Sequence, residues 1–203
     1  MYVGSPAGEA TQQIGDEKEL TLLFFDVRNF TPFIEQNISF DIIHIIRKLF
    51  ISCENIIENN GGRIIETMGD GFYAVFGLQS DKTDAANAAV QSSLSILEDL
   101  EVLNNEYYQP YFNYKVGMGI HIGKVITGSI RLGTQDRFVA MGYAVNIAAR
   151  LQAMTKQLDN NLIVSDVVFN KLKNPPQNHY STSADLKGVT GVCQIHLIGQ
   201  SYS

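Results

Sequence analysis

The alternation of apolar and polar residues divides the first part of the chain into strands and one long helix. Leu20–Val27 is a short, aromatic and continuous apolar run, which is typical of a central strand buried on both faces. Apolar residues recur at helical spacing over 39–59. Two strand patterns follow, at 63–68 and 71–76, and the glycine-containing step between them predicts a tight hairpin with Asp70 at its tip.

The second part of the chain completes a core of alternating strands and helices. A helical stripe over 83–103 is followed by two strand patterns, 114–121 and 124–130, which we expect to be joined at Gly123. The resulting βαββαβ order is the ferredoxin-like arrangement, an antiparallel sheet with helices on one face. The sequence therefore predicts the α+β class.

The last third of the chain predicts a C-terminal αβ extension of that core. A helix is expected over 143–154 and a short strand over 162–164. Ser165 is expected to cap a further helix that runs to Leu172. An alternating strand within 184–198 closes the chain.

Composition narrows the class of protein. A chain of 203 residues that is 45% hydrophobic suffices for one buried domain, which we place at 19–203 behind a linker of small residues at 1–18. The net charge of -6 without a basic stripe argues against a nucleic-acid partner. No apolar run approaches the roughly 20 residues that cross a bilayer. We therefore expect a cytoplasmic domain that contacts membrane only through other parts of a parent protein.

Two acidic residues each stand at the end of an apolar strand. Asp26 ends the first strand and Asp70 lies in the predicted hairpin, so adjacent strands would bring the two carboxylates together. Such a pair is suited to hold Mg²⁺ or Mn²⁺ and points to phosphoryl chemistry. A helix cap or a turn explains either residue better when it is taken alone, whereas the two together favour the metal site.

The segment after the first of these strands predicts an anion site. Thr31 is suited to be an N-cap and Pro32 to be the first helical residue. The first amides of a helix have no partner within the helix and bind anions. We therefore expect the backbone amides of Arg28, Asn29, Phe30 and Thr31 to cradle a polyphosphate.

A polar pair lies on the predicted helix at 143–154. Asn146 and Arg150 are one turn apart and project from the same face. An amide beside a guanidinium suits a ribose oxygen and a phosphate on which charge develops during reaction. Taken alone, a solvated helix face explains this pair better.

Together these segments resemble the catalytic domain of the class III nucleotidyl cyclases, the adenylyl and guanylyl cyclases. The resemblance covers Leu20 to about Leu197 and rests on Phe25-Asp26-Val27 with Phe30-Thr31, Met68-Gly69-Asp70-Gly71, Gly119-Ile120-His121, and Val145-Asn146 with Arg150. It implies that Asp26, Asp70 and the Val27 carbonyl bind two Mg²⁺ or Mn²⁺ ions per active site. It also implies a homodimer in which Asn146 and Arg150 complete the site from the other subunit.

The resemblance also suggests which base is bound. Glu66 stands where adenylyl cyclases usually have Lys, and a carboxylate accepts from N1 and N2 of guanine, which favours GTP. Guanylyl cyclases usually have Arg, Tyr and Cys where this chain has Arg137, Phe138 and Val139. Arg137 is suited to donate to guanine O6 or to a phosphate, whereas Val139 matches neither specificity. Lys187 resembles a late basic residue that touches terminal phosphates, although an exposed loop lysine explains it equally well.

We therefore predict a homodimeric, metal-dependent guanylyl cyclase domain that converts GTP to 3′,5′-cyclic GMP and pyrophosphate. An adenylyl or dual-specificity cyclase that uses ATP stays open because of Val139. A catalytically inactive nucleotide-binding or dimerisation module is a third interpretation. The presence of Asp26, Asp70, Asn146 and Arg150 argues against this last one.

Overall fold

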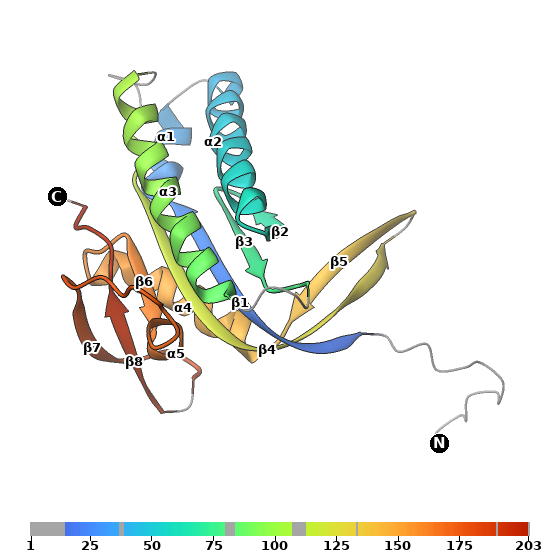
Figure 1. Cartoon of the computed structure of the whole chain (residues 1–203). Helices are drawn as coiled ribbons and strands as arrows, with labels where there is room; N and C mark the ends of the chain where they lie inside the picture. Colours follow the sequence, from blue (N-terminus) through green and yellow to red (C-terminus); the bar gives the residue numbers. More distant parts are fainter. Residues whose placement is uncertain are drawn as a thin grey trace.

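The computed structural model describes residues 15–36, 39–79, 84–106, 113–132, 134–189 and 191–202. In chain order its elements are β1 (Asp16–Val27), α1 (Phe30–Gln36), α2 (Ser39–Asn59), β2 (Gly62–Met68), β3 (Gly71–Phe76), α3 (Ala85–Glu106), β4 (Val116–Leu132), β5 (Gln135–Met141), α4 (Tyr143–Gln157), β6 (Leu162–Ser165), α5 (Asp166–Phe169), β7 (Tyr180–Asp185) and β8 (Val192–Leu197) (Figure 1). The expected α+β class is confirmed. None of the helices in the described ranges is long and apolar enough to cross a membrane.

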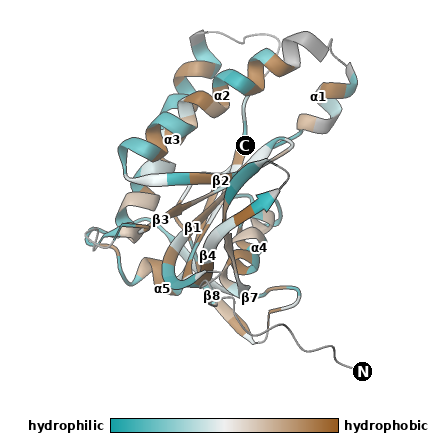
Figure 2. Ribbon diagram, turned by 90° about the vertical axis from the view of Figure 1, so that its right-hand side faces the viewer, coloured by the Kyte–Doolittle hydropathy of each residue, from teal (hydrophilic) through white to brown (hydrophobic). Residues whose placement is uncertain are grey.

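The strands form one sheet in the order β2-β3-β1-β4-β6-β8-β7, and β5 pairs with β4 outside this path. Among the first four strands of this order each neighbouring pair is antiparallel, as the ferredoxin-like core requires. β6 joins β4 in parallel, so the C-terminal extension continues the same sheet. The helices α2 and α3 lie side by side over one face of the sheet (Figure 1). Along each of them hydrophilic and hydrophobic positions alternate (Figure 2).

The central strand β1 is buried on both faces, which explains its continuous apolar run. Leu23 and Phe25 belong to the cluster packed under α2 and α3. Leu22 and Phe24 point to the opposite face and pack with Ala148 of α4. The expectation of helices on one face therefore holds for α2 and α3, whereas α4 covers the other face.

The prediction of two strands joined at Gly123 is wrong. β4 is one strand over Val116–Leu132, and Gly123 pairs with Leu20 of β1 in its middle. A Cβ atom at Gly123 would lie 2.6 Å from the Cβ of Ala144. The glycine is therefore required because α4 packs closely against the strand, and not because the chain turns.

Other parts of the structure also differ from the prediction. β1 begins at Asp16, so 16–18 of the expected linker belong to the sheet, while 1–14 lie outside the described residues. The helix after Ser165 ends at Phe169 rather than Leu172. β5 and β7 were not predicted, because most of their residues are exposed and they lack an apolar stripe. With the end of β4, β5 forms a hairpin that protrudes from the sheet (Figure 1).

The histidine on β4 makes stability depend on pH. Nδ1 of His121 lies 2.9 Å from Oγ of Ser165, and burial lowers the pKa of His121 from 6.5 to about 4. In the unfolded chain His121 takes up a proton as the pH falls below 6.5. In the folded chain it does so only near pH 4. Stability should therefore fall by about 2 kcal/mol between about pH 7 and pH 4.5 from this group alone.

Urea unfolding of wild type and His121→Gln at both pH values measures this contribution. The variant should lose less stability on acidification than wild type does. The same substitution at His44, which is exposed on α2, is the matched control and should follow wild type. Equal pH slopes for wild type and His121→Gln would show that His121 is not the responsible group.

Candidate active site

β1 and the β2–β3 hairpin bring the two predicted carboxylates to one hollow. Asp26 is opposite Gly71 in the β1–β3 pairing, and the amide of Val27 donates to the Asp70 carbonyl at 3.1 Å. Asp26, Val27 and Asp70 all line a hollow of about 630 Å³, named here the carboxylate hollow. The structure thus places together the three residues that the sequence suggested as metal ligands.

The electrostatics of the carboxylate hollow are unfavourable for two bare carboxylates. Burial raises the pKa of Asp26, and the charge of Asp70 raises it further. An ion pair with Arg28, with Nη1 donating to Oδ2 of Asp26 at 2.9 Å, partly offsets both effects. The Asp26 side chain is 35% exposed, so it remains accessible to a ligand in the hollow.

The oxygen donors of the carboxylate hollow fit divalent cations such as Mg²⁺ or Mn²⁺. Magnesium is usually bound by one or two carboxylates together with substrate phosphates and water. Asp26 and Asp70 supply the carboxylates, and Val27, whose carbonyl is the predicted third ligand, lines the hollow beside them. Within the described ranges, no group of three or more His, Cys, Asp or Glu residues forms a closed metal site. Any further ligands of a bound ion would therefore come from outside this set of side chains, such as water or phosphate.

Arg28 does not belong to the predicted anion cradle. Its amide donates to the Lys115 carbonyl at 2.6 Å and is therefore occupied. Its guanidinium is directed to the protein: besides the Asp26 carboxylate it contacts the Gln152 carbonyl at 3.0 Å and the Tyr202 hydroxyl at 3.3 Å. Arg28 thus ties a candidate metal ligand to the end of α4 and to the C-terminal segment.

The helix after β1 also begins earlier than predicted. α1 starts at Phe30, so Thr31 lies inside the helix and is not its N-cap. Asn29 precedes the helix with φ 57°, a left-handed conformation that asparagine tolerates better than most residues. Asn29 and Phe30 line the carboxylate hollow, whereas the side chain of Thr31 lies outside the described residues. A phosphate contact by the amides of Asn29, Phe30 and Thr31 stays a prediction.

The carboxylate hollow contains residues that the sequence analysis missed. Lys115 precedes β4, Lys156 lies in the last turn of α4, and Tyr202 lies near the C-terminus. No local motif marks these residues, because only the fold brings the three segments together. The positive charges of Lys115 and Lys156 lie beside the carboxylates of Asp26 and Asp70. This arrangement suits a polyphosphate with bound cations.

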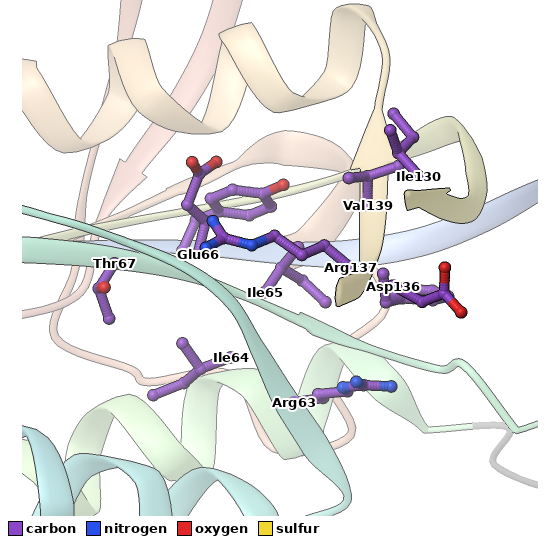
Figure 3. Close-up of a pocket in the computed structure, with 11 residues that line it drawn as sticks. Arg63, Ile64, Ile65, Glu66, Thr67, Ile130, Asp136, Arg137 and Val139 are labelled. Atoms are coloured by element: carbon purple, nitrogen blue, oxygen red, sulfur yellow. The ribbon is translucent and has the colours of Figure 1, made fainter. Parts of the chain in front are cut away.

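The predicted base-contacting residues line a second hollow, of about 520 Å³, named here the base pocket. Glu66 comes from β2 and Arg137 and Val139 from β5. Figure 3 shows Arg137 extended toward Glu66, while Asp136 points away from them. Tyr73 of β3 also lines the pocket. Acceptor oxygens and guanidinium donors therefore face one cavity.

The predicted polar pair on α4 lies apart from both hollows. Asn146 and Arg150 are exposed, while Ile147 and Leu151 on the opposite side of α4 are buried. Neither Asn146 nor Arg150 lines the carboxylate hollow or the base pocket.

Lys187 is also outside both hollows. It is exposed in the turn after β7, and its neighbour Leu186 packs in the cluster that contains Ile147 and Leu151 of α4. Lys187 is therefore on the part of the molecule that carries α4, and its contact with phosphate stays a prediction.

Comparison with known proteins adds independent information. The sequence matches the model of the family "Adenylate and Guanylate cyclase catalytic domain" over residues 13–201. A terminal-differentiation specific adenylate cyclase of Dictyostelium discoideum is 28% identical over 165 residues, which cover 79% of this chain and 8% of that protein. The receptor-type guanylate cyclase gcy-28 of Caenorhabditis elegans is 26% identical over 134 residues, which cover 66% of this chain and 10% of that protein.

The fold is also that of a solved structure. The crystal structure of the guanylyl cyclase Cya2 matches with a TM-score of 0.83 at 23% identity, covering 92% of this chain and 94% of that one. The chain spans a tenth or less of the length of the two curated relatives described above.

Proposed function

Because the chain belongs to the adenylate and guanylate cyclase catalytic domain family, we propose that it converts GTP to 3′,5′-cyclic GMP and pyrophosphate. We choose GTP because Glu66 and Arg137 converge in the base pocket (Figure 3). Guanine presents donors at N1 and N2 and an acceptor at O6, which complement a carboxylate and a guanidinium. Adenine would place the lone pair of N1 against the carboxylate, and an unpaired contact of this kind disfavours the wrong base.

ATP is the second candidate substrate, and Val139 is the observation that favours it. The side chain of Val139 lines the base pocket but offers neither a hydrogen-bond donor nor an acceptor. Guanine selection therefore gains no hydrogen bond from the side chain at this position and rests mainly on Glu66 and Arg137. When fewer polar contacts select the base, the ratio of kcat/KM for GTP to kcat/KM for ATP is smaller.

The separation of the candidate residues within one chain, into the carboxylate hollow, the base pocket and the pair on α4, supports a homodimer. Asn146 and Arg150 face solvent on α4, away from the carboxylate hollow. Beside them Met141 and Tyr143 are 52% and 51% exposed, and large exposed apolar side chains are typical of an interface. A two-fold dimer would place α4 of one subunit against the carboxylate hollow of its partner and would form two equivalent sites.

The chain's own residues then have distinct roles. Asp26 and Asp70 would hold the divalent cations, which would lower the pKa of the ribose 3′-hydroxyl and neutralise phosphate charge. Lys115 and Lys156 attract the triphosphate by their charge. From the other subunit, Asn146 orients the ribose and Arg150 stabilises the charge that develops as the 3′-oxygen attacks the α-phosphorus and pyrophosphate leaves.

Glu66→Lys tests the choice of base. We expect kcat/KM for GTP to fall by about 100-fold, because the ammonium group faces the donors of guanine, while ATP is used at least as well as before. Glu54→Lys makes the same charge change on the exposed side of α2 and is the matched control. Rates of cyclic GMP and cyclic AMP formation in Mn²⁺ give both values. An unchanged GTP rate in Glu66→Lys would show that Glu66 does not recognise the base.

A further inference from the structure

One buried side chain joins the two walls of the base pocket. Glu66 is on β2 and Val139 is on β5, and these strands pair with β3 and β4 respectively, not with each other. Tyr73 of β3 lies opposite Glu66 in the β2–β3 pairing. Its hydroxyl donates to the carbonyl of Ala140, the residue after Val139, at 3.2 Å. The side chain therefore bridges from one wall to the other.

The position of Tyr73 is itself fixed by packing. The side chain is 6% exposed, and its ring stacks on Phe24 with centroids 5.2 Å apart and an interplanar angle of 9°. Burial and the charge of Glu66 both raise the pKa of the Tyr73 hydroxyl, so it stays protonated and remains a donor. The bond to Ala140 is buried, and a buried carbonyl that loses its partner is costly.

β5, which carries the acceptor Ala140, needs the support of this hydrogen bond from Tyr73. Among the described strands β5 pairs with β4 and with no other, and it belongs to the hairpin that protrudes from the sheet (Figure 1). Gln135, Asp136 and Arg137 are exposed, so packing holds this end of the strand weakly. β5 also contacts β2 through Arg63, whose guanidinium lies 5.0 Å from the centroid of the Phe138 ring, but Arg63 is exposed. The spacing between Arg137 and Glu66 therefore depends on this exposed contact and on the buried bond of Tyr73 to Ala140.

We propose that Tyr73 is a positioning residue for base selection, which holds β5 at a fixed distance from Glu66 through its hydroxyl. This inference rests on the proposed function, because it assumes that the base enters this pocket. Recognition of a base edge requires donors and acceptors at a set spacing, and loss of that spacing weakens the correct base more than the wrong one.

Tyr73→Phe tests the role, because it keeps the ring on Phe24 and removes one hydrogen bond. We expect KM for GTP to rise about fivefold and the GTP-to-ATP ratio of kcat/KM to fall by a similar factor, while kcat changes by less than about twofold. Tyr114→Phe is the matched control. Tyr114 is also buried, and its hydroxyl also donates to a backbone carbonyl, that of Ile45 at 3.0 Å, under α2 and α3.

The outcomes separate this role from the proposed function. Both variants should lose similar stability in urea, and only Tyr73→Phe should shift the nucleotide ratio. If wild type forms cyclic product and Tyr73→Phe has the same KM and ratio as Tyr114→Phe, the role of Tyr73 is overturned and the proposed function stands. If wild type forms no cyclic product from either nucleotide, the proposed function fails, and this role with it.

A second variant covers the case in which Tyr73→Phe does not fold. Phe24→Leu removes the ring on which Tyr73 stacks and leaves the hydroxyl in place. The freed Tyr73 side chain should hold β5 less firmly and lower the GTP-to-ATP ratio in the same direction. An unchanged ratio in folded Phe24→Leu would overturn the proposal.

Discussion

Asp26→Asn is expected to lower the rate of cyclic nucleotide formation by about 100-fold or more while the protein stays folded. Asparagine keeps the shape of the side chain but removes one of the two negative charges that face the carboxylate hollow. In the protein without ligand this charge is unfavourable, because burial and Asp70 both raise the pKa of Asp26. The variant should therefore unfold at the same temperature as wild type or slightly above it.

The measurement combines initial rates in Mn²⁺ with thermal unfolding followed by circular dichroism. Asp185→Asn, at an exposed position of β7, makes the same chemical change away from the hollow and should leave the rate unchanged. A folded Asp26→Asn protein that retains a near-normal rate would contradict the assignment of Asp26 as a metal ligand. Loss of rate together with loss of fold would instead assign Asp26 a structural role through its ion pair with Arg28.

Mixing two inactive variants is expected to restore activity if the sites are shared between subunits. Asp70→Ala removes a carboxylate and Arg150→Ala removes the guanidinium on α4, so each homodimer lacks one of these groups at both sites. A heterodimer of the two has one site with both groups intact. Random exchange of subunits forms half heterodimers, so the mixture should reach about one quarter of wild-type specific activity.

A second mixture is the control for this experiment. Asp26→Asn and Asp70→Ala damage the same half of the site, so every site in their heterodimer lacks one carboxylate. No activity should return in that mixture. Failure of the Asp70→Ala and Arg150→Ala mixture to regain activity, with heterodimers shown to form, would place each site within one chain.

The parts of the fold that the sequence predicted are those with a strong local pattern. α2 has the predicted bounds, and β1 has the expected burial on both faces, because in each the apolar residues follow the period of the element. The hairpin at Asp70 was predicted from its glycines and placed the two carboxylates correctly. The family resemblance to class III cyclases was confirmed by the family match.

The parts that the sequence did not predict depend on contacts between distant segments. The sequence predicts a turn at Gly123, whereas the structure requires glycine there because Ala144 of α4 approaches closely, a contact that no local sequence pattern reveals. Arg28 was placed in an anion cradle, whereas Lys115 and Gln152 occupy its hydrogen-bonding groups from far along the chain. β5 was missed since its exposed face carries no apolar stripe, although the residues on it had been singled out for base recognition.

The central claim is a GTP-using cyclase whose sites need two chains. Its most direct test is the initial rate of cyclic nucleotide formation from GTP and from ATP, in Mn²⁺, across a dilution series of the protein. We predict that cyclic GMP forms faster than cyclic AMP and that specific activity falls on dilution, as shared sites require. Absence of cyclic product from either nucleotide at the highest protein concentration would contradict the claim, and a faster rate with ATP would contradict the choice of GTP.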